Sequence, residues 1–461
     1  MHDSGDTIVA VASGNANAGV AVIRVSGAKA LDILYHMNAK AVTARMAEVR
    51  NLYDHQGFFL DKALILYFTT PKSFTGEDVV EIHPHGNRFL VEKIISTIIF
   101  FGARLARPGE FSERAFINGK IDLVQAEAIA DLIAAQSAAA VCASQQSLSG
   151  LFSQDINSIA NFITETRVYC ETLIDFSDDI ESDGSDNVNY YSLIENNLLT
   201  IINKLSFLLK QADQGLNISR IPSILLFGKP NVGKSSLMNI FARDDVAIVN
   251  ESAGTTRDIL KNTVNIGSMT FQLLDSAGLN CSRDPVEFEG IRRAKNSFST
   301  VDLVLYVVDV NESIKHAVDF LVQNINIDNK SIFIVKNKAD LLNNESIFFE
   351  IDSKFSFDSI KFFCYTSSIT GFGIDSLKNA IVDFFEIRHF ETPFSARQRH
   401  IDLIRKSLGM VSQARRSLVD FSFELMAEDL RSAAEYLFEI TGKITTDEML
   451  GKIFSTFCVG K

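Results

Sequence analysis

The first part of the chain alternates short apolar runs of strand length with one longer run of helical length. Residues 7–10, 20–25 and 63–68 are rich in β-branched and aromatic residues, which favour strands. Residues 89–101 repeat apolar side chains at helical spacing. We therefore expect residues 1–119 to form one compact α+β domain.

Beyond this domain the pattern becomes helical over residues 123–209. Residues 126–143 are rich in alanine, the strongest helix former. Apolar residues then fall on one helical face at Ile156, Ile159, Phe162 and Ile163. Residues 175–187 interrupt the pattern with six acidic and no basic side chains, which predicts an exposed loop.

Residues 216–383 alternate apolar runs with helical patterns, as in an α/β domain with a parallel sheet. The helical pattern then resumes with Ile401, Ile404, Leu408 and Val411. Because helix flanks this region on both sides, we predict a multidomain protein. An α+β domain at residues 1–119 would precede an all-α helical domain made of residues 120–215 and 384–461, into which the α/β domain at 216–383 is inserted.

A phosphate-binding loop opens the inserted domain. Gly228-Lys229-Pro230-Asn231-Val232-Gly233-Lys234-Ser235 follows an apolar strand run and leads into a helical pattern. In such a loop, backbone N–H groups surround the phosphates, Lys234 contacts the β and γ oxygens, and the Ser235 hydroxyl binds Mg²⁺. The chain is therefore predicted to be a P-loop nucleotide-binding protein.

Two further motifs fit the switch regions of a GTPase. Gly254-Thr255-Thr256-Arg257-Asp258 has no apolar periodicity, and its Thr256 hydroxyl would join Mg²⁺. Asp275-Ser276-Ala277-Gly278 follows an alternating strand run, so that Asp275 would reach Mg²⁺ through water and the Gly278 N–H would meet the γ-phosphate.

The base-recognition motif selects guanine. Asn337-Lys338-Ala339-Asp340 follows a buried-strand run, and we expect the Asp340 carboxylate to be buried and to accept from guanine N1–H and the exocyclic amine. Adenine lacks this donor pair, so ATP should be rejected. Thr366-Ser367-Ser368 fits the last loop over the base.

Composition narrows the class of protein further. The 461 residues exceed what one core supports, and a net charge of −13 disfavours broad non-specific nucleic-acid binding. The five cysteines are scattered without a C-x-x-C pair, so we expect no disulfide framework or zinc cluster. We find no signal peptide or membrane span and expect a cytoplasmic protein with no membrane association.

The chain resembles the MnmE/TrmE family of bacterial tRNA-modifying GTPases across essentially its whole length. Beyond the GTPase motifs, the resemblance rests on Asp6-Thr7-Ile8-Val9-Ala10, Ser73-Phe74-Thr75-Gly76-Glu77-Asp78, Arg107-Pro108-Gly109-Glu110-Phe111-Ser112-Glu113-Arg114-Ala115-Phe116, Asn118-Gly119-Lys120-Ile121-Asp122-Leu123 and Cys458-Val459-Gly460-Lys461. It implies an N-terminal tetrahydrofolate-binding domain that also makes a homodimer.

The resemblance also implies a reaction and a partner. With the separate FAD-dependent protein MnmG, in a heterotetramer or larger complex, the family adds an aminomethyl or carboxymethylaminomethyl group to carbon 5 of the wobble uridine, position 34 of certain tRNAs. The one-carbon unit would come from a tetrahydrofolate derivative, in its 5,10-methylene or 5-formyl form. GTP, Mg²⁺ and K⁺ complete the implied cofactors.

By motif position, the family's folate contacts fall on Arg24, Glu81, Lys120 and Lys461. Residue type alone favours a surface charge for a lone arginine or lysine, and it is the surrounding motifs that favour folate contacts. The chain also departs from the family at residues 13–19, where a Gly/Pro/Arg-rich turn is usual, and at residues 83–86, where the family is richer in glycine. These departures affect the expected folate contacts.

Cys458 lies four residues from the end of the sequence, among phenylalanines. Its residue type favours a packing role, and its last two neighbours do not suit prenylation. The resemblance instead implies a catalytic thiol near the folate, so both interpretations stay open.

The residue that orients the hydrolytic water is not the usual glutamine, because Leu279 occupies that place. The resemblance assigns the catalytic role to Glu287, with Glu289 as the alternative. Arg257 and Arg283 are candidate arginine fingers, although switch or surface charges are the simpler interpretation.

In the family, a K⁺ ion takes the place of an arginine finger. The resemblance implies K⁺ ligands at Asn231, Asn250, Ser252 and Thr255, beside Mg²⁺ ligands at Ser235 and Thr256. The residues assigned to GTP by the motifs and the resemblance together are Asn231, Val232, Gly233, Lys234, Ser235, Ser236, Asn250, Glu251, Ser252, Ala253, Gly254, Thr255, Thr256, Asp275, Ser276, Ala277, Gly278, Asn337, Lys338, Ala339, Asp340, Thr366, Ser367 and Ser368.

A different class of protein shares the GTPase motifs: a ribosome-assembly or regulatory GTPase that binds RNA without modifying it. The folate-like N-terminus, the terminal Cys458-Val459-Gly460-Lys461 and the lack of a basic RNA-binding module after the GTPase motifs argue against it. The densest basic cluster is Arg397, Arg399, Arg405, Lys406, Arg415 and Arg416. We expect a solvated helix face there, with a tRNA surface as the alternative.

Overall fold

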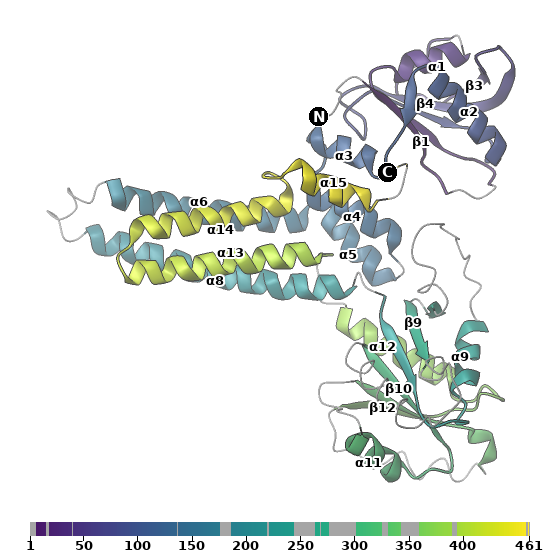
Figure 1. Cartoon of the computed structure of the whole chain (residues 1–461), viewed down its shortest axis with the longest axis vertical. Helices are drawn as coiled ribbons and strands as arrows, with labels where there is room; N and C mark the ends of the chain where they lie inside the picture. The colour runs from purple at the N-terminus through teal and green to yellow at the C-terminus, as the bar shows by residue number, and fades with distance from the viewer. Residues whose placement is uncertain are drawn as a thin grey trace. The chain divides into compact units, whose positions relative to one another are not determined.

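The computed structural model describes residues 6–14, 18–38, 40–135, 137–175, 186–218, 221–243, 263–267, 269–275, 301–324, 331–342, 359–389, 394–457 and 460 (Figure 1). The chain separates into two compact units. Unit 1 contains Met1–Ala134, Ser144–Asp213 and Phe394–Lys461, and unit 2 contains Ala135–Ala143 and Gln214–Pro393.

A six-stranded sheet with strand order β3-β4-β5-β2-β1-β6 begins unit 1. Its strands are β1 (Thr7–Val11), β2 (Ile23–Ser26), β3 (Glu48–Tyr53), β4 (Phe59–Phe68), β5 (Val79–His83) and β6 (Ala103–Leu105). All neighbouring strands are antiparallel except β1 and β6. In β4, buried positions alternate with more exposed ones, as expected for a sheet with one well-packed face.

Two helices, α1 (Ala30–Asn38) and α2 (Arg88–Phe100), pack on the main core of this sheet. Asn87 caps α2 by accepting from the N–H groups of Phe89 and Leu90. A smaller apolar cluster contains Ile8, Ala10, Ala106 and Phe111, the last of these from α3 (Glu110–Ile117). Strand β1 therefore contributes Val9 to the main core on one face and Ile8 and Ala10 to the smaller cluster on the other.

The rest of unit 1 is helical, and its long helices lie side by side in Figure 1. The helices are α4 (Leu123–Ala134), α5 (Ala138–Leu148), α6 (Leu151–Asp175), α8 (Asp186–Ile218), α13 (Gln398–Val419), α14 (Phe423–Thr441) and α15 (Asp447–Ser455). Residues 138–143 of α5 and residues 214–218 of α8 belong to unit 2. Helix α14 packs along both α6 and α13, so segments before and after unit 2 share one core. Helix α15 packs against α3, and its Phe454, together with Phe457 just after the helix, forms an apolar cluster with Leu123 and Ala126 of α4.

Unit 2 contains a second six-stranded sheet, with order β12-β11-β10-β7-β9-β8. Its strands are β7 (Ser223–Phe227), β8 (Thr263–Ile266), β9 (Met269–Asp275), β10 (Leu303–Asp309), β11 (Ile332–Asn337) and β12 (Ile360–Tyr365). Only β8 and β9 pair antiparallel. Besides parts of α5 and α8, the described helices of this unit are α9 (Lys234–Arg243), α11 (Ile314–Asn324), the 3₁₀ turn η2 (Ala339–Leu341) and α12 (Ile374–His389).

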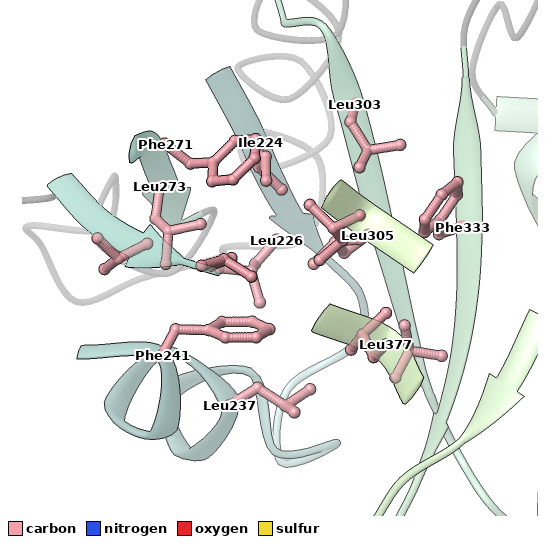
Figure 2. Close-up of a cluster of buried hydrophobic side chains, with 14 of the residues drawn as sticks. Ile224, Leu226, Leu237, Phe241, Phe271, Leu273, Leu303, Leu305, Phe333 and Leu377 are labelled. Carbon is pink, nitrogen blue, oxygen red and sulfur yellow. The ribbon is translucent and has the colours of Figure 1, made fainter. Parts of the chain in front are cut away.

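Helices cover both faces of this sheet. On one face, Leu237 and Phe241 of α9 and Leu377 of α12 meet Leu226 and Leu305 of the central strands (Figure 2). On the other face, α11 contributes Ala317 and Leu321 to a separate cluster. The central strands β7, β10 and β11 are buried almost throughout, as expected for a parallel sheet covered on both sides.

The predicted multidomain fold class is confirmed: an α+β region, a helical region and an α/β P-loop unit all occur. Two local predictions need correction. The strand expected at residues 20–25 is β2 at Ile23–Ser26, and Val20 is exposed. Of the loop expected at residues 175–187, Asp175 ends α6 and Asp186 begins α8, while residues 176–185 lie outside the described residues. Within the described part of the chain, each long helix is too polar to cross a bilayer.

Candidate functional site

The nucleotide motifs meet at the carboxyl edge of the unit 2 sheet. Strand β7 ends at Phe227 before the phosphate loop, β11 ends at Asn337 in the base motif, and β12 ends at Tyr365 before Thr366. Parallel strands place these ends at one edge, where α/β proteins bind ligands. Strand β9 ends there too, at Asp275, whose backbone is in register with Leu226; its side chain is not described.

Tight packing fixes the phosphate loop. A Cβ added at Gly228 would lie 2.2 Å from the Val307 carbonyl oxygen, and one at Gly233 would lie 2.1 Å from Asn337 Nδ2. Both glycines have positive φ, which side chains oppose. Glycine is therefore required at these two positions by the close approach of neighbouring atoms as well as by phosphate binding.

The charged and polar groups of this loop lie at the start of α9. Lys234 is buried, and its Nζ donates to the carbonyl oxygens of Gly228 at 2.8 Å and Lys229 at 2.7 Å. Ser235 is exposed in the first turn of α9, where the helix dipole favours phosphate. Asn231 is exposed and has a φ of 63°, a left-handed conformation that asparagine tolerates.

Asn337 links three parts of the site. Its Nδ2 donates to the Val232 carbonyl oxygen at 2.9 Å, which ties the base motif to the phosphate loop. Its Oδ1 accepts from the Ser368 N–H at 3.2 Å, the Ser368 hydroxyl at 3.1 Å and the Thr366 hydroxyl at 3.3 Å. Because Asn337 is 1% exposed, these bonds are well shielded and hold the three loops together.

The expectation of a buried Asp340 is wrong for this structure, because the residue is exposed. Its Oδ1 accepts from the Ser367 hydroxyl at 2.5 Å, so the last loop orients the carboxylate. Exposure leaves its edge accessible for a base. Ser236, exposed in α9, and Ala339, buried in η2, are also described. The assigned residues that lie outside the described residues are Asn250, Glu251, Ser252, Ala253, Gly254, Thr255, Thr256, Arg257, Ser276, Ala277, Gly278, Arg283, Glu287, Glu289, Cys458 and Lys461.

A second polar cluster lies on the unit 1 sheet, where two of the predicted folate residues pair directly. Arg24 on β2 donates through Nε to Glu81 Oε1 on β5 at 2.9 Å, and its Nη2 lies 2.9 Å from the same oxygen. The guanidinium also lies over the rings of Phe74 and Phe111. Both charged side chains are partly exposed, at 22% and 17%, so a ligand can reach them.

His83 is a member of this cluster that the motifs did not predict. It lies two residues after Glu81 on β5, hence on the same face of the sheet. Its Nε2 lies 3.6 Å from Glu81 Oε2 and is buried without a hydrogen-bond partner among the described residues. Since buried polar atoms are normally paired, this nitrogen is a sign of an incomplete site.

Of the other two predicted folate residues, the structure describes Lys120 and the neighbour of Lys461. Lys120 Nζ donates to the Pro71 carbonyl oxygen at 2.9 Å, beside the segment that contains Phe74. Gly460, next to Lys461, lies against the end of β1: a Cβ there would be 2.0 Å from the Val11 carbonyl oxygen. Strand β1 is the neighbour of β2, so the chain's last described residue lies one strand from Arg24.

A cavity of about 350 Å³ lies elsewhere on the unit 1 sheet. It is lined by residues that include Val11, Gly14, Ala21, Gly86 and Val91. Ala21 and Val91 belong to the core on the α1 and α2 face. The predicted folate residues Arg24, Glu81 and Lys120 are not among its described lining residues.

Several motifs that carry the resemblance form an ion network beneath the sheet. Arg114, 8% exposed, donates to Asp6 Oδ1 at 2.6 Å, Glu77 Oε2 at 3.0 Å and Glu110 Oε1 at 3.2 Å. Arg104 pairs with Asp6 and Glu110 as well. Burial raises the pKa of Glu110, but the arginines outweigh it and lower that pKa to about 2. These motif residues therefore stabilise the N-terminal part of unit 1 through ion pairs with one another.

The prediction of a solvated basic face is wrong for Arg397 and Arg399. Arg399 donates to both oxygens of Glu127 on α4, at 2.8 and 2.7 Å. Arg397 donates to Asp131 at 2.6 Å. Glu127 is 2% exposed, so this is an ion cluster inside the helical core. The sequence pattern could not show it, because the partners lie far apart in the chain.

His400 completes this cluster. Its Nδ1 accepts from the Arg397 N–H at 3.1 Å, so the proton of the neutral ring lies on Nε2, which donates to Glu127 at 2.8 Å. Burial lowers the pKa of His400 and so favours the neutral form. Burial also opposes ionisation of Glu127, but its contacts with His400 and Arg399 outweigh that effect and hold its pKa well below the usual value.

Comparison with known proteins places the chain among tRNA-modifying relatives. The model of the MnmE helical domain matches residues 123–458, and that of the GTP-binding protein TrmE N-terminus matches residues 7–120. The tRNA modification GTPase MnmE of Legionella pneumophila (strain Paris) is 41% identical over 459 residues, covering 99% of each chain. That of Methylococcus capsulatus is 37% identical over 457 residues, again covering 99% of each.

Proposed function

This chain belongs to the MnmE/TrmE family, and on that premise we propose the details of its reaction. It is a GTP hydrolase of tRNA modification. With the FAD-dependent protein MnmG, it adds an aminomethyl or carboxymethylaminomethyl group to carbon 5 of the uridine at position 34 of certain tRNAs. A tetrahydrofolate derivative supplies the one-carbon unit.

The observation that carries the GTPase role is the joining of three loops by Asn337. The phosphate loop, the base motif and the last loop are held in one arrangement by hydrogen bonds within the protein. Such preorganisation lowers the ordering cost of binding. The hydrogen bond from the Ser367 hydroxyl orients the Asp340 carboxylate, which is available to accept from the two donors of guanine.

The hydrolytic step is proposed from this geometry and the switch motifs. Ser235 and Thr256 would hold Mg²⁺, and Glu287 would orient the water that attacks the γ-phosphate. The exposed side chain of Asn231, on a left-handed backbone, fits an oxygen ligand for K⁺ beside the phosphates. Asn250, Ser252 and Thr255 would supply its other ligands, and the ion would provide the positive charge of an arginine finger.

Folate binding is proposed for the cluster of Arg24, Glu81 and His83. A pterin ring presents neighbouring N–H donors that a carboxylate accepts, and an aromatic face that Phe74 can contact. Two observations support it: the buried, unpaired Nε2 of His83 and the partial exposure of the Arg24–Glu81 pair. Lys120 and Lys461 would bind the glutamate tail, and Cys458 would act beside the folate.

We further propose a cytoplasmic homodimer formed through the N-terminal domain, residues 1–119. It would join MnmG in a heterotetramer or larger complex. The helical domain would comprise residues 120–215 and 384–461, and the GTPase domain residues 216–383.

Mass analysis of wobble uridines in a strain lacking this gene tests the modification role. We expect the modified uridine to disappear, to return with the parent gene and to stay absent with an Asp340→Asn variant. Capture of MnmG by the tagged protein provides the second arm. Unchanged uridines together with altered ribosome profiles would support an RNA-binding assembly GTPase instead.

A further inference from the structure

The turn between β10 and α11, residues 309–312, belongs to none of the nucleotide motifs, yet it lies at the centre of the nucleotide edge. Strand β10 is paired with β7, which precedes the phosphate loop, and with β11, which precedes the base motif. Asp309 is directly opposite Asn337 in this register. The turn can therefore contact both halves of the site.

One end of the turn holds the lysine of the base motif. Lys338 Nζ donates to Asp309 Oδ2 at 2.8 Å. Asp309 Oδ1 accepts from the N–H and the Nδ2 of Asn311, both at 3.1 Å, which fixes the carboxylate. The hydrogen bond from Lys338 lowers the pKa of Asp309, so this carboxylate is charged near neutral pH.

Lys338 also has an unusual backbone conformation. Its φ is 69°, a left-handed conformation that is unfavourable for a lysine. The side chain begins two residues before Asp340 and carries four methylene groups, which suit the face of a flat base. The pair with Asp309 restricts a side chain that would otherwise sample many rotamers.

The other end of the turn holds the phosphate loop. Lys229 Nζ donates to Glu312 Oε1 at 2.7 Å, and the ammonium also lies over the Phe320 ring. Lys229 is the residue whose carbonyl oxygen accepts from Lys234 Nζ. A shift of Lys229 would therefore move an acceptor that holds the phosphate-binding lysine.

We propose that residues 309–312 form a clamp that positions both lysines, with Asp309 acting on the base side and Glu312 on the phosphate side. Asp309 and Glu312 are positioning residues: they act through Lys338 and Lys229. The proposal rests on GTP binding by this unit and deepens it, because it predicts that the affinity for guanine nucleotides depends on two carboxylates outside the recognised motifs.

The test measures GDP and GTP affinity by titration of the full-length chain for the parent, Asp309→Asn and Glu312→Gln. Because both pairs are partly exposed, we expect affinity losses of roughly three- to tenfold. Asp309→Asn should weaken GDP and GTP equally, since both share the base. Asp319→Asn is the matched control: it removes the same charge from an exposed position on α11 and should bind like the parent.

Double-mutant cycles separate positioning from general destabilisation. In a Lys338→Met background, Asp309→Asn should have no further effect, and in a Lys229→Met background the same holds for Glu312→Gln. The clamp would be overturned if both carboxylate variants bound nucleotide with parental affinity. It would also be overturned if each carboxylate substitution reduced affinity as much in its lysine-to-methionine background as in the parent. A parent chain that binds no GTP would instead overturn the proposed function, so the two failures are distinguishable.

Discussion

Glu127→Gln tests the ion cluster of the helical core most directly. The substitution keeps the size and one acceptor oxygen but removes the charge that faces Arg399 and Arg397 at 2.7 and 3.5 Å. Glu127 and His400 are each 2% exposed, so little water can replace the lost partner. Removing one member of a buried ion pair costs about 3–5 kcal/mol, and we expect about 3 kcal/mol because the arginines are partly exposed.

The pH dependence gives a second, independent measurement. The pKa of Glu127 is lowered in the fold, so its contribution to stability is full above its unfolded pKa of about 4.3 and is lost as the pH falls. Burial keeps His400 neutral, so protonation of the unfolded chain below about pH 6.5 also favours unfolding. The parent should therefore lose stability on acidification, and Glu127→Gln should lose less.

Urea unfolding followed by far-UV circular dichroism measures both effects, because the chain contains no tryptophan for fluorescence. Glu435→Gln, on an exposed face of α14, is the matched control and should change stability by less than about 0.5 kcal/mol. GTP binding in unit 2 should be retained by both variants. A loss below about 1 kcal/mol for Glu127→Gln, with a parental pH profile, would refute the buried cluster.

Four further predictions concern the nucleotide. Gly233→Ala should abolish GTP binding, measured by titration, because its Cβ would lie 2.1 Å from Asn337 Nδ2; retained binding would contradict the packing. Asp340→Asn should weaken GTP binding and transfer preference to xanthine nucleotides, and parental GTP hydrolysis would contradict this. Glu287→Ala should retain GTP but lower turnover by one or more orders of magnitude, roughly the range for general acid–base groups; unchanged turnover would move the role elsewhere. Asn231→Ala should remove the several-fold gain in hydrolysis expected when K⁺ replaces Na⁺, and equal rates for the parent in both salts would refute the ion site.

The nucleotide edge was predictable because its chemistry is local in sequence. Each motif directly follows an apolar run, and a parallel sheet brings such strand ends to one edge. The loop Gly228–Ser235 and Asn337 are therefore placed as the pattern indicates. The exposure of Asp340 was not predictable, because it depends on how far a short 3₁₀ turn extends beyond the strand.

The ion pairs between residues far apart in the chain could not be predicted from the sequence. Arg399 and Glu127 are 272 residues apart, so a dense basic stretch gave no sign of its buried partner. The same holds for Asp309 and Lys338, which only strand pairing brings together. Likewise, the motif residues Glu77, Glu110 and Arg114 are recognisable as a pattern, but only the fold shows that they pair with one another.

The buried polar groups of the helical core are concentrated where the chain returns from unit 2. Phe394 stacks on Phe152 at 4.1 Å, and the N–H of Ser395 donates to the buried hydroxyl of Ser147 at 3.0 Å. Arg397 and Arg399 follow at once, paired with α4. An apolar contact permits sliding, whereas directional bonds to α4 and α5 define one register for α13. We infer that these bonds, rather than the apolar contact alone, set the position of α13 against α4 and α5 within unit 1.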